Sequence, residues 1–528
     1  MRKIVSDGGR LKAAIVYTSI IVLATVTRAY GIWEWSLVGD EIFTMRHSYE
    51  RWTELVGPAH YALVVLMDNV FGLTEWSLRL PTVILGIVSI PIFYFLCRRI
   101  FDQTTALVGT VLLLVSDWHL LFSQYARYYG GVFLFGTVAY FTYVEALRED
   151  STSLLVLSLA SCLFGFLFHP TFLVVPLSCA AASALVWGWP RGGSTEFSRR
   201  IGKIYFLVCA AAGLVVFPWV IEFAQGWIES HATGSGGTFQ VSAVVGSLLD
   251  LVNRIGIVLS ASSFFGFYFL VKKNLRLGAL LGLLAGVPVL SYVLATELVP
   301  PFRPRYIYAF FPLVIAFTAF VSSEIIRAFP EYGFARYAML AIVVVGMLPG
   351  FVSYYTGRQS LDPEDAIHVL EDKYRAGDKV LAIPIGVHYK IGQVHPGWEL
   401  LDRGEDGWRD RVQRAARAEG RVWIITPSSA IPGVGEARKS WLIDHASLVW
   451  RRHAFGYERS MGGMSVWRVD QIGSEGRASE AHLHNRGLWT DCKGGSMIGS
   501  IEAACVRMGK SCESGVELNR HLQALRAL

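Results

Sequence analysis

Residues 78–97 read LRLPTVILGIVSIPIFYFLC, a run of 20 residues in which Arg79 is the only charged one. A transmembrane helix needs about 20 predominantly apolar residues. The composition agrees, because 17% of the 528 residues are charged, against about 25% in typical soluble domains. The sequence therefore predicts an α-helical polytopic membrane protein.

Further apolar segments of this kind bring the predicted number of transmembrane helices to about eleven. They are Leu11–Trp33, Thr105–Phe122, Tyr129–Leu147, Ser153–Phe168, Thr171–Trp189, Tyr205–Phe223, Leu251–Val271, Leu277–Ala295, Tyr306–Ser323 and Tyr337–Tyr355. The apolar piece Tyr61–Phe71 is too short to span a bilayer and is predicted to lie at the interface. Leu11–Trp33 is too long for the core of a signal peptide and no small-residue cleavage site follows it, so we expect it to remain as a span.

Lys and Arg residues gather at the N-terminus and in alternate loops, which the positive-inside rule places in the cytoplasm. These clusters are Arg2, Lys3, Arg10 and Lys12; Arg98 and Arg99; Arg191, Arg199, Arg200 and Lys203; Lys272, Lys273 and Arg276; and Arg327 and Arg336. The net charge of +6 comes from such clusters and not from a basic stripe, which argues against nucleic-acid binding. An odd number of spans places everything after Tyr355 outside the cell.

From Asp362 onward the pattern changes to that of a small soluble α/β domain. Helices are predicted at Pro363–Tyr374 and Trp408–Glu419, and strands at Lys379–Pro384, Arg421–Pro427, Ser447–Arg452 and Met464–Val469. We therefore expect a transmembrane module at 1–355, an extracytoplasmic α/β domain at 356–470 and a weakly structured tail at 471–528. The tail cysteines Cys492, Cys505 and Cys512 match no zinc spacing and can form at most one internal disulfide.

Polar motifs mark the predicted outer ends of the spans. Gly39-Asp40-Glu41 follows the first span, FGLTEWSLRLP (71–81) leads into the second, SQYARYY (123–129) follows the third, and PPFRPRY (300–306) precedes a late span. Four arginines on this side depart from the positive-inside rule, namely Arg79, Arg127, Arg303 and Arg305. Charge near hydrocarbon is costly unless a negative group meets it, so these arginines are candidate functional residues.

Taken in this order, the motifs resemble those of the GT-C polytopic glycosyltransferases. The resemblance covers roughly Leu11 to Val469 and is strongest to the group of protein O-mannosyltransferases, lipid A aminoarabinose transferases and related bacterial family-39 enzymes. Its most specific part is FG-x-x-E-x-x-x-R-L-P followed by S-Q-x-A-R-x-Y. One departure is at 56–58, where this chain reads VGP and many relatives carry His-Pro-Pro; His60 lies two residues beyond.

The resemblance implies an inverting glycosyltransferase of the plasma (inner) membrane, with a cytoplasmic N-terminus. It would move a sugar from a polyprenyl phosphate to a protein, lipid or glycan acceptor at the extracytoplasmic face. Asp40 is the predicted base that takes the acceptor proton, and Glu41 would orient the acceptor or hold the base. One guanidinium group can bind two phosphate oxygens at once. A second group of residues is therefore predicted to bind the lipid phosphate and the sugar. They are Arg79, Arg127, Tyr128, Arg303, Arg305 and Tyr306.

Several alternatives compete with these assignments. Some GT-C enzymes use a divalent metal ion to hold the acceptor. No cofactor is predicted here, because the Asp40-Glu41 pair gives a metal only two adjacent carboxylates. Asp40 and Glu41 could instead favour a helix N-terminus, Arg79 could be a snorkelling anchor, and His169 before Pro170 could simply break a helix. The rival functions are a transporter or lipid-linked-sugar flippase, an oligosaccharide-transferring enzyme, and an inactive relative. A transporter should show paired repeats with broken helices, and no convincing repeat is present.

Overall fold

The protein is described by a computed structural model in two compact units, residues 1–362 with 454–459, and residues 363–453 with 460–528. Within them the structure describes residues 7–33, 37, 40–41, 43–45, 48, 57–189, 197–231, 241–298, 303–358, 363–375, 378–382, 399–400, 408–419, 421–427, 441–442, 444–452 and 464–469. The predicted tail at 471–528, with its three cysteines, lies outside these residues.

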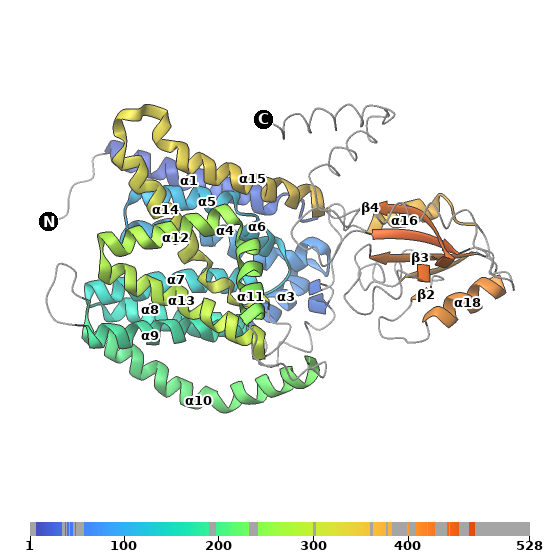
Figure 1. The fold of residues 1–528 in the computed structure, drawn as a ribbon, viewed down its shortest axis with the longest axis horizontal. Helices are drawn as coiled ribbons and strands as arrows, with labels where there is room; N and C mark the ends of the chain where they lie inside the picture. Colours follow the sequence, from blue (N-terminus) through green and yellow to red (C-terminus); the bar gives the residue numbers. More distant parts are fainter. Residues whose placement is uncertain are drawn as a thin grey trace. The chain divides into compact units, whose positions relative to one another are not determined.

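The first unit is a bundle of helices (Figure 1). In chain order these are α1 (Asp7–Ala29), α3 (Pro58–Phe71), α4 (Glu75–Ile100), α5 (Gln103–Val115), α6 (Asp117–Gln124), α7 (Tyr129–Glu149), α8 (Thr152–Phe168), η1 (Pro170–Leu173), α9 (Val174–Gly188), α10 (Arg199–His231), α11 (Val241–Ile255), α12 (Ile257–Lys273), α13 (Leu275–Leu298), η2 (Pro304–Phe310), α14 (Phe311–Ala328), η3 (Pro330–Tyr337) and α15 (Ala338–Arg358). Every predicted span falls on one or two of these helices.

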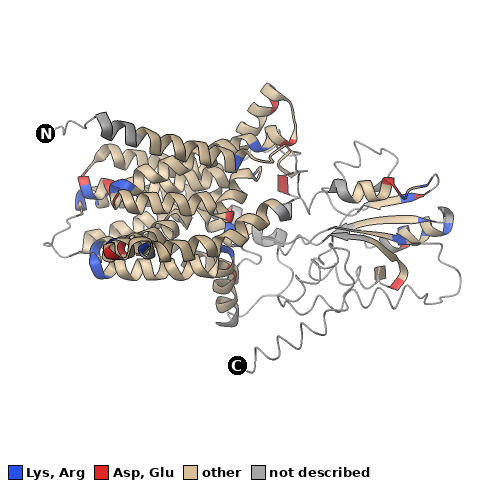
Figure 2. Cartoon of the chain, turned by 90° about the horizontal axis from the view of Figure 1, so that it is seen from above, with Lys and Arg blue, Asp and Glu red and all other residues tan. Residues whose placement is uncertain are grey.

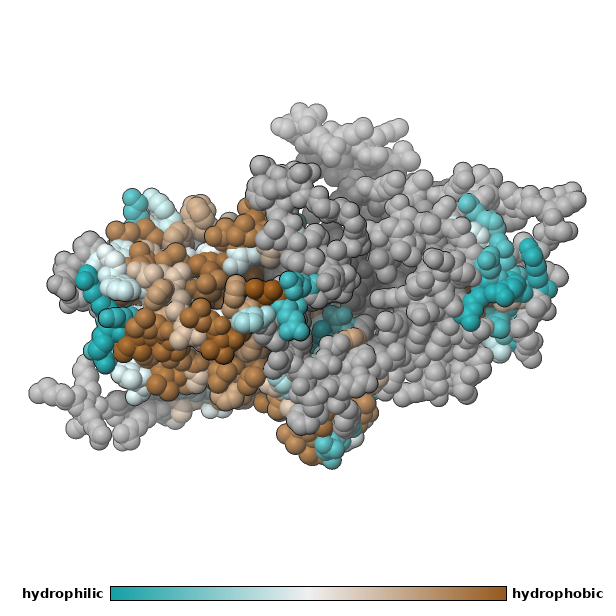
Figure 3. Space-filling view, turned by 90° about the horizontal axis from the view of Figure 1, so that it is seen from below, coloured by the Kyte–Doolittle hydropathy of each residue, from teal (hydrophilic) through white to brown (hydrophobic). Residues whose placement is uncertain are grey.

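The count of spans depends on how bent and short helices are treated. Seven stretches of the described residues are long and apolar enough to cross a bilayer, and two bent helix pairs raise the number to nine. The apolar helices Ala14–Ala29 and Thr152–Phe168 are shorter; adding these two to the nine gives the eleven predicted segments. The apolar middle of the unit forms a brown surface in Figure 3. The predicted fold class, a polytopic helical membrane protein, is confirmed.

Two of the segments predicted as single spans are broken. The segment Thr105–Phe122 bends by 61° between α5 and α6, where the Ser116 hydroxyl accepts a hydrogen bond from the backbone N–H of His119. The segment Leu251–Val271 bends by 101° between α11 and α12, at Gly256 with φ of 93°. Serine favours a helix N-cap and glycine tolerates positive φ, so both breaks have a local cause.

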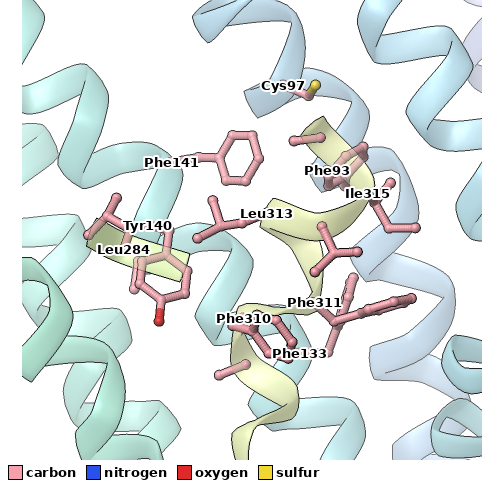
Figure 4. Packing of buried hydrophobic residues seen from close by; sticks show 14 of the residues in the cluster. Phe93, Cys97, Phe133, Tyr140, Phe141, Leu284, Phe310, Phe311, Leu313 and Ile315 are labelled. Atoms are coloured by element: carbon pink, nitrogen blue, oxygen red, sulfur yellow. The ribbon is translucent and has the colours of Figure 1, made fainter. Parts of the chain in front are cut away.

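The interior of the unit is built around α4, α7 and α14, whose large side chains interlock. Figure 4 shows Phe93 of α4, Phe133 and Phe141 of α7, and Phe311 of α14 packed into one apolar cluster. In contrast, α10 and α15 are mostly exposed along their lengths, as expected of helices that face lipid.

Small residues let two of these helices approach closely. A Cβ atom on Gly266 of α12 would clash with the backbone oxygen of Phe317 on α14. We expect Gly266→Ala to lower the unfolding temperature in detergent, with a free-energy cost of about 1–3 kcal/mol from overpacking. The matched control is Gly286→Ala on α13, where nothing lies within 4 Å of the added atom. Equal unfolding temperatures for the two variants would contradict this packing.

The predicted cytoplasmic loops meet at one end of the unit. Exposed ion pairs link the ends of the helices there, and Figure 2 shows Lys and Arg gathered at that end of a largely uncharged bundle. These pairs are Arg99–Glu149 (3.0 Å), Arg200–Asp150 (3.2 Å), Lys273–Glu324 (2.7 Å) and Arg327–Asp102 (2.6 Å). Exposed pairs add little stability, but these show which loops share an end.

The second unit is a small α/β domain, as predicted. Its strands are β1 (Lys379–Ala382), β2 (Glu399–Leu400), β3 (Val422–Pro427), β4 (Ser447–Arg452) and β5 (Met464–Val469), in the order β2-β1-β3-β5-β4. β1 pairs in parallel with β2 and β3, whereas β5 is antiparallel to β3 and β4. Alternate residues of β1 point to opposite faces, so Val380 packs with α16 (Pro363–Glu371) and Leu381 with α18 (Trp408–Glu419).

Candidate functional site

The predicted site residues come together at the end of the helical unit opposite the basic loops. Five short segments contribute: 40–44 after α1, the start of α3, the turn at 125–128 between α6 and α7, the corner at 169 between α8 and η1, and 303–306 before α14. The contacts among these segments are described below from the most buried outward.

Glu41 and Arg79 form a fully buried ion pair. Arg79 Nε donates to Glu41 Oε1 and Arg79 NH2 to Glu41 Oε2, both at 2.8 Å, and neither side chain is exposed. Arg79 NH1 also donates to the carbonyl oxygen of Ile32 at 3.0 Å. The interpretation of Arg79 as a snorkelling anchor is therefore wrong. With both side chains buried against protein, this pair can position other groups, and direct contact with a substrate is not available to it here.

The pair reaches the α6–α7 turn through the backbone of one residue, Ala126. The backbone N–H of Ala126 donates to Glu41 Oε1 at 3.0 Å, and its carbonyl oxygen accepts from His60 Nε2 at 3.3 Å. Burial, with a smaller effect of Arg127, lowers the pKa of His60 to about 3, so its ring is neutral. Sequence reasoning noted His60 only as displaced from the relatives' pattern. In the structure its ring contacts the backbone of Ala126, the residue before Arg127.

Asp40 contacts Arg305, and its charge also acts on Arg127. Its Oδ2 is 3.3 Å from Arg305 NH1, with 33% of the Asp40 side chain and 19% of the Arg305 side chain exposed. Arg127 NH1 donates to the hydroxyl of Thr44 at 3.3 Å. Burial disfavours the charge on Arg127, but Tyr128 and Asp40 favour it and raise the pKa of Arg127 overall. Within the described residues, Nε of Arg127 and Nε of Arg305 are buried without a hydrogen-bond partner.

Three aromatic rings join the two arginines. Arg127 lies over the ring of Tyr128 at 5.0 Å, and Arg305 over the ring of Tyr306 at 5.5 Å. His169 stacks on Tyr128, with centroids 3.9 Å apart, and lies parallel to Tyr306 at 6.0 Å. The predicted helix break at His169 is present, but its ring also occupies the middle of the site.

Two further points concern Arg303 and metals. In the part of the chain that the structure describes, no hydrogen bond or ion pair of the Arg303 side chain is found; its carbonyl oxygen accepts from the N–H of Tyr306 at 3.0 Å. Among the described residues, no three His, Cys, Asp or Glu side chains lie together as metal ligands. A binding role for Arg303 and the absence of a metal both stay predictions.

A second buried arginine helps to hold α6, the helix that leads into the α6–α7 turn of the site. Sequence reasoning missed this residue. Arg28, at the end of α1, donates to the carbonyl oxygens of Leu113 (2.6 Å) and Leu114 (2.8 Å), in the last turn of α5 before the break. Gln124 Nε2 donates to the carbonyl oxygens of Arg28 (2.8 Å) and Tyr30 (2.9 Å). These bonds hold α6, and so the turn after it. The sequence did carry a signal for this role, because an arginine inside the first apolar segment needs buried hydrogen-bond partners.

The site therefore combines a partly exposed carboxylate with two guanidinium groups and a set of aromatic rings. A carboxylate can accept a proton, guanidinium groups bind phosphate oxygens, and aromatic faces stack on sugars or on cations.

The chain is similar to known glycosyltransferases. Residues 56–221 match the family model described as dolichyl-phosphate-mannose-protein mannosyltransferase. ArnT from Cupriavidus metallidurans in the apo state is 12% identical over 88% of this chain and 99% of its own, with a TM-score of 0.51. The oligosaccharyltransferase AglB from Archaeoglobus fulgidus, in complex with an inhibitory peptide and a dolichol-phosphate, is 11% identical over 90% of this chain and 77% of its own, with a TM-score of 0.52.

No curated protein matches the chain significantly by sequence. At 11–12% identity the structural matches establish the fold, and the family model adds a sequence match over the segment that carries Arg79, Arg127 and Tyr128. The chain therefore has the fold of the GT-C polytopic membrane glycosyltransferases, and residues 56–221 match one mannosyltransferase family among them.

Proposed function

We propose that this protein is an inverting glycosyltransferase that moves a hexose or pentose from a polyprenyl phosphate to a protein, lipid or glycan acceptor. The observation that carries the proposal is the position of Asp40, 3.3 Å from Arg305 and close to Arg127. A candidate base and two candidate phosphate-binding groups thus lie at the same end of a membrane bundle. AglB, which shares the fold, has been solved with a dolichol-phosphate, and this supports a lipid-phosphate donor.

The reaction would be a single displacement. The acceptor hydroxyl oxygen forms a bond to the anomeric carbon while the bond from that carbon to the phosphate oxygen breaks, and the configuration inverts. Asp40 takes the hydroxyl proton, which it can do because its carboxylate is partly exposed. The phosphate oxygen takes the bonding electron pair, and Arg127 and Arg305 stabilise the negative charge that develops there.

The distribution of charge supports an extracytoplasmic site. The loops with most Lys and Arg residues share one end of the bundle, through pairs such as Arg327–Asp102 and Lys273–Glu324. The positive-inside rule assigns that end to the cytoplasm, which assigns the opposite end, with Asp40, to the exterior. The polyprenyl chain would remain in the bilayer while its sugar phosphate lies at the outer interface of the plasma (inner) membrane.

The experiment that tests the proposal is transfer of labelled sugar from polyprenyl-phosphate donors in proteoliposomes that contain the purified protein. Transfer with inversion at the anomeric carbon is the expected result. Movement of lipid between leaflets without transfer from any donor would favour the flippase alternative instead.

Replacing Arg127 by glutamine is expected to raise the KM for the donor by about 10- to 100-fold, because a hydrogen bond between charged groups contributes about 1.5–3 kcal/mol. Turnover at saturating donor should fall less. Initial rates over a range of donor concentrations give both values. The matched control is Arg200→Gln, which removes an exposed guanidinium at the opposite end of the bundle and should leave the donor KM unchanged. An unchanged KM in Arg127→Gln would remove Arg127 from the donor site.

A further inference from the structure

His169 is the centre of a continuous series of contacts that runs from Arg127 through Tyr128 and Tyr306 to Arg305. The series draws on three separate parts of the chain: the α6–α7 turn, the α8–η1 corner and the start of η2. Only 5% of the His169 surface is exposed. With Tyr128 stacked on one face and so little of the ring exposed, the nitrogen atoms at the ring edge are the groups left to meet a ligand.

The hydrogen bonds of His169 decide which ring nitrogen carries the proton. The backbone N–H of Thr171 points at Nδ1 at 3.3 Å, and the Thr171 hydroxyl lies 2.7 Å from the same nitrogen. A backbone N–H can only donate, so Nδ1 is the acceptor and Nε2 carries the hydrogen. Burial, and then Arg127 and Arg305, lower the pKa of His169 well below its usual value. The ring is therefore neutral, with one N–H donor at Nε2.

Both hydrogen bonds of the His169 side chain found among the described residues go to Nδ1, and none goes to Nε2. Nε of Arg127 and Nε of Arg305 are buried and have no hydrogen-bond partner there. Buried donors in proteins are nearly always satisfied, and unsatisfied ones point to a missing partner. Donors from Arg127, Arg305 and His169, all near one stack of rings, call for a ligand rich in acceptor oxygens.

The charges of the site match one kind of ligand. Asp40 contributes −1 and the two arginines +2, which leaves +1 for a ligand to neutralise. A sugar phosphodiester carries a single negative charge, whereas the phosphate monoester released by transfer carries about −1.5 to −2. A neutral N–H strengthens binding of the phosphodiester without adding a positive charge that would hold the product more tightly.

We propose that His169 is a substrate-binding residue whose Nε2–H donates a hydrogen bond to a phosphate oxygen of the lipid-linked donor, between Arg127 and Arg305. This inference rests on the proposed function for the identity of the ligand. That His169 is a neutral donor in an anion-binding site follows from other observations. These are its stacking on Tyr128, its hydrogen bonds with Thr171, and the unpartnered Nε atoms of Arg127 and Arg305.

The test compares two substitutions. His169→Phe keeps a flat ring for the stack and removes the N–H, while the amide nitrogen of His169→Gln can take the place of Nε2. We expect His169→Phe to raise both the donor KM and the Kd for polyprenyl phosphate by about 10-fold or more, the effect of losing a hydrogen bond to a charged group. His169→Gln should recover most of this loss. Binding is measured to polyprenyl phosphate in nanodiscs, and unfolding temperatures check that each variant is folded.

The outcomes separate the two proposals. If the wild type binds polyprenyl phosphate and His169→Phe binds it equally well with an unchanged KM, the role of His169 is overturned and the proposed function stands. If His169→Gln binds polyprenyl phosphate as weakly as His169→Phe does, while both unfold as the wild type does, an N–H donor at this position does not restore binding and the donor role is overturned. If the wild type binds polyprenyl phosphate but transfers no sugar, and His169→Phe weakens that binding, the His169 assignment holds although the proposed function fails.

Discussion

Replacing Asp40 by asparagine is expected to lower the rate of sugar transfer by about 10²- to 10⁴-fold, the usual contribution of a general base. The amide has nearly the shape of the carboxylate but cannot take the acceptor proton. Donor binding should persist or tighten, because Arg305, 3.3 Å from Asp40, would lose its anionic partner and become available to phosphate. Initial rates at saturating donor measure the first effect, and the Kd for polyprenyl phosphate measures the second.

The matched control is Asp150→Asn. Asp150 is exposed, pairs with Arg200 at the opposite end of the bundle and has a φ of 52°, a conformation that asparagine tolerates well. This variant should transfer sugar as the wild type does. Wild-type turnover in Asp40→Asn would show that Asp40 is not the base, and loss of donor binding with retained stability would assign it to the binding of substrate.

The helices could be predicted from the sequence because apolar composition is a local property. Each predicted span is helical, including the short Ser153–Phe168, which forms α8. The breaks were missed because the prediction rested on apolar composition, which continues on both sides of Ser116 and Gly256. At the bend after Val115, Ser116 caps α6, and Arg28, a residue of another helix, donates to the carbonyl oxygens of Leu113 and Leu114.

The sequence predicted which residues belong to the site, but not which carboxylate pairs with which arginine. The motifs identified the segments that carry Asp40, Glu41, Arg127 and Arg305, since charge at a membrane boundary stands out in a sequence. Which carboxylate meets which arginine depends on the packing of α4, α6 and η2, and no local pattern encodes it. His169 illustrates the same limit: Pro170 predicts the helix break, whereas the stack on Tyr128 exists only in the folded chain.

Breaking the buried pair is expected to have the largest effect on stability. Arg79→Met should destabilise the protein by about 3–5 kcal/mol, because it leaves the Glu41 carboxylate buried without its guanidinium partner. Thermal unfolding in detergent measures this loss. Arg99→Met is the control, since Arg99 pairs with Glu149 on the exposed surface and such pairs contribute about 0–1 kcal/mol.

Double variants separate stability from positioning at this pair. Arg79→Met combined with either Glu41→Leu or Glu41→Gln removes the unpaired charge, so both should unfold closer to the wild-type temperature than Arg79→Met alone. They differ at one hydrogen bond. In the wild type Glu41 accepts from the backbone N–H of Ala126 at 3.0 Å; the Gln side chain keeps an oxygen that can accept this bond, whereas the Leu side chain has none. Because Ala126 directly precedes Arg127, the donor KM should stay near the wild-type value with Gln and rise with Leu. Equal KM values in two equally stable double variants would show that Glu41 serves stability alone and does not position the phosphate-binding turn.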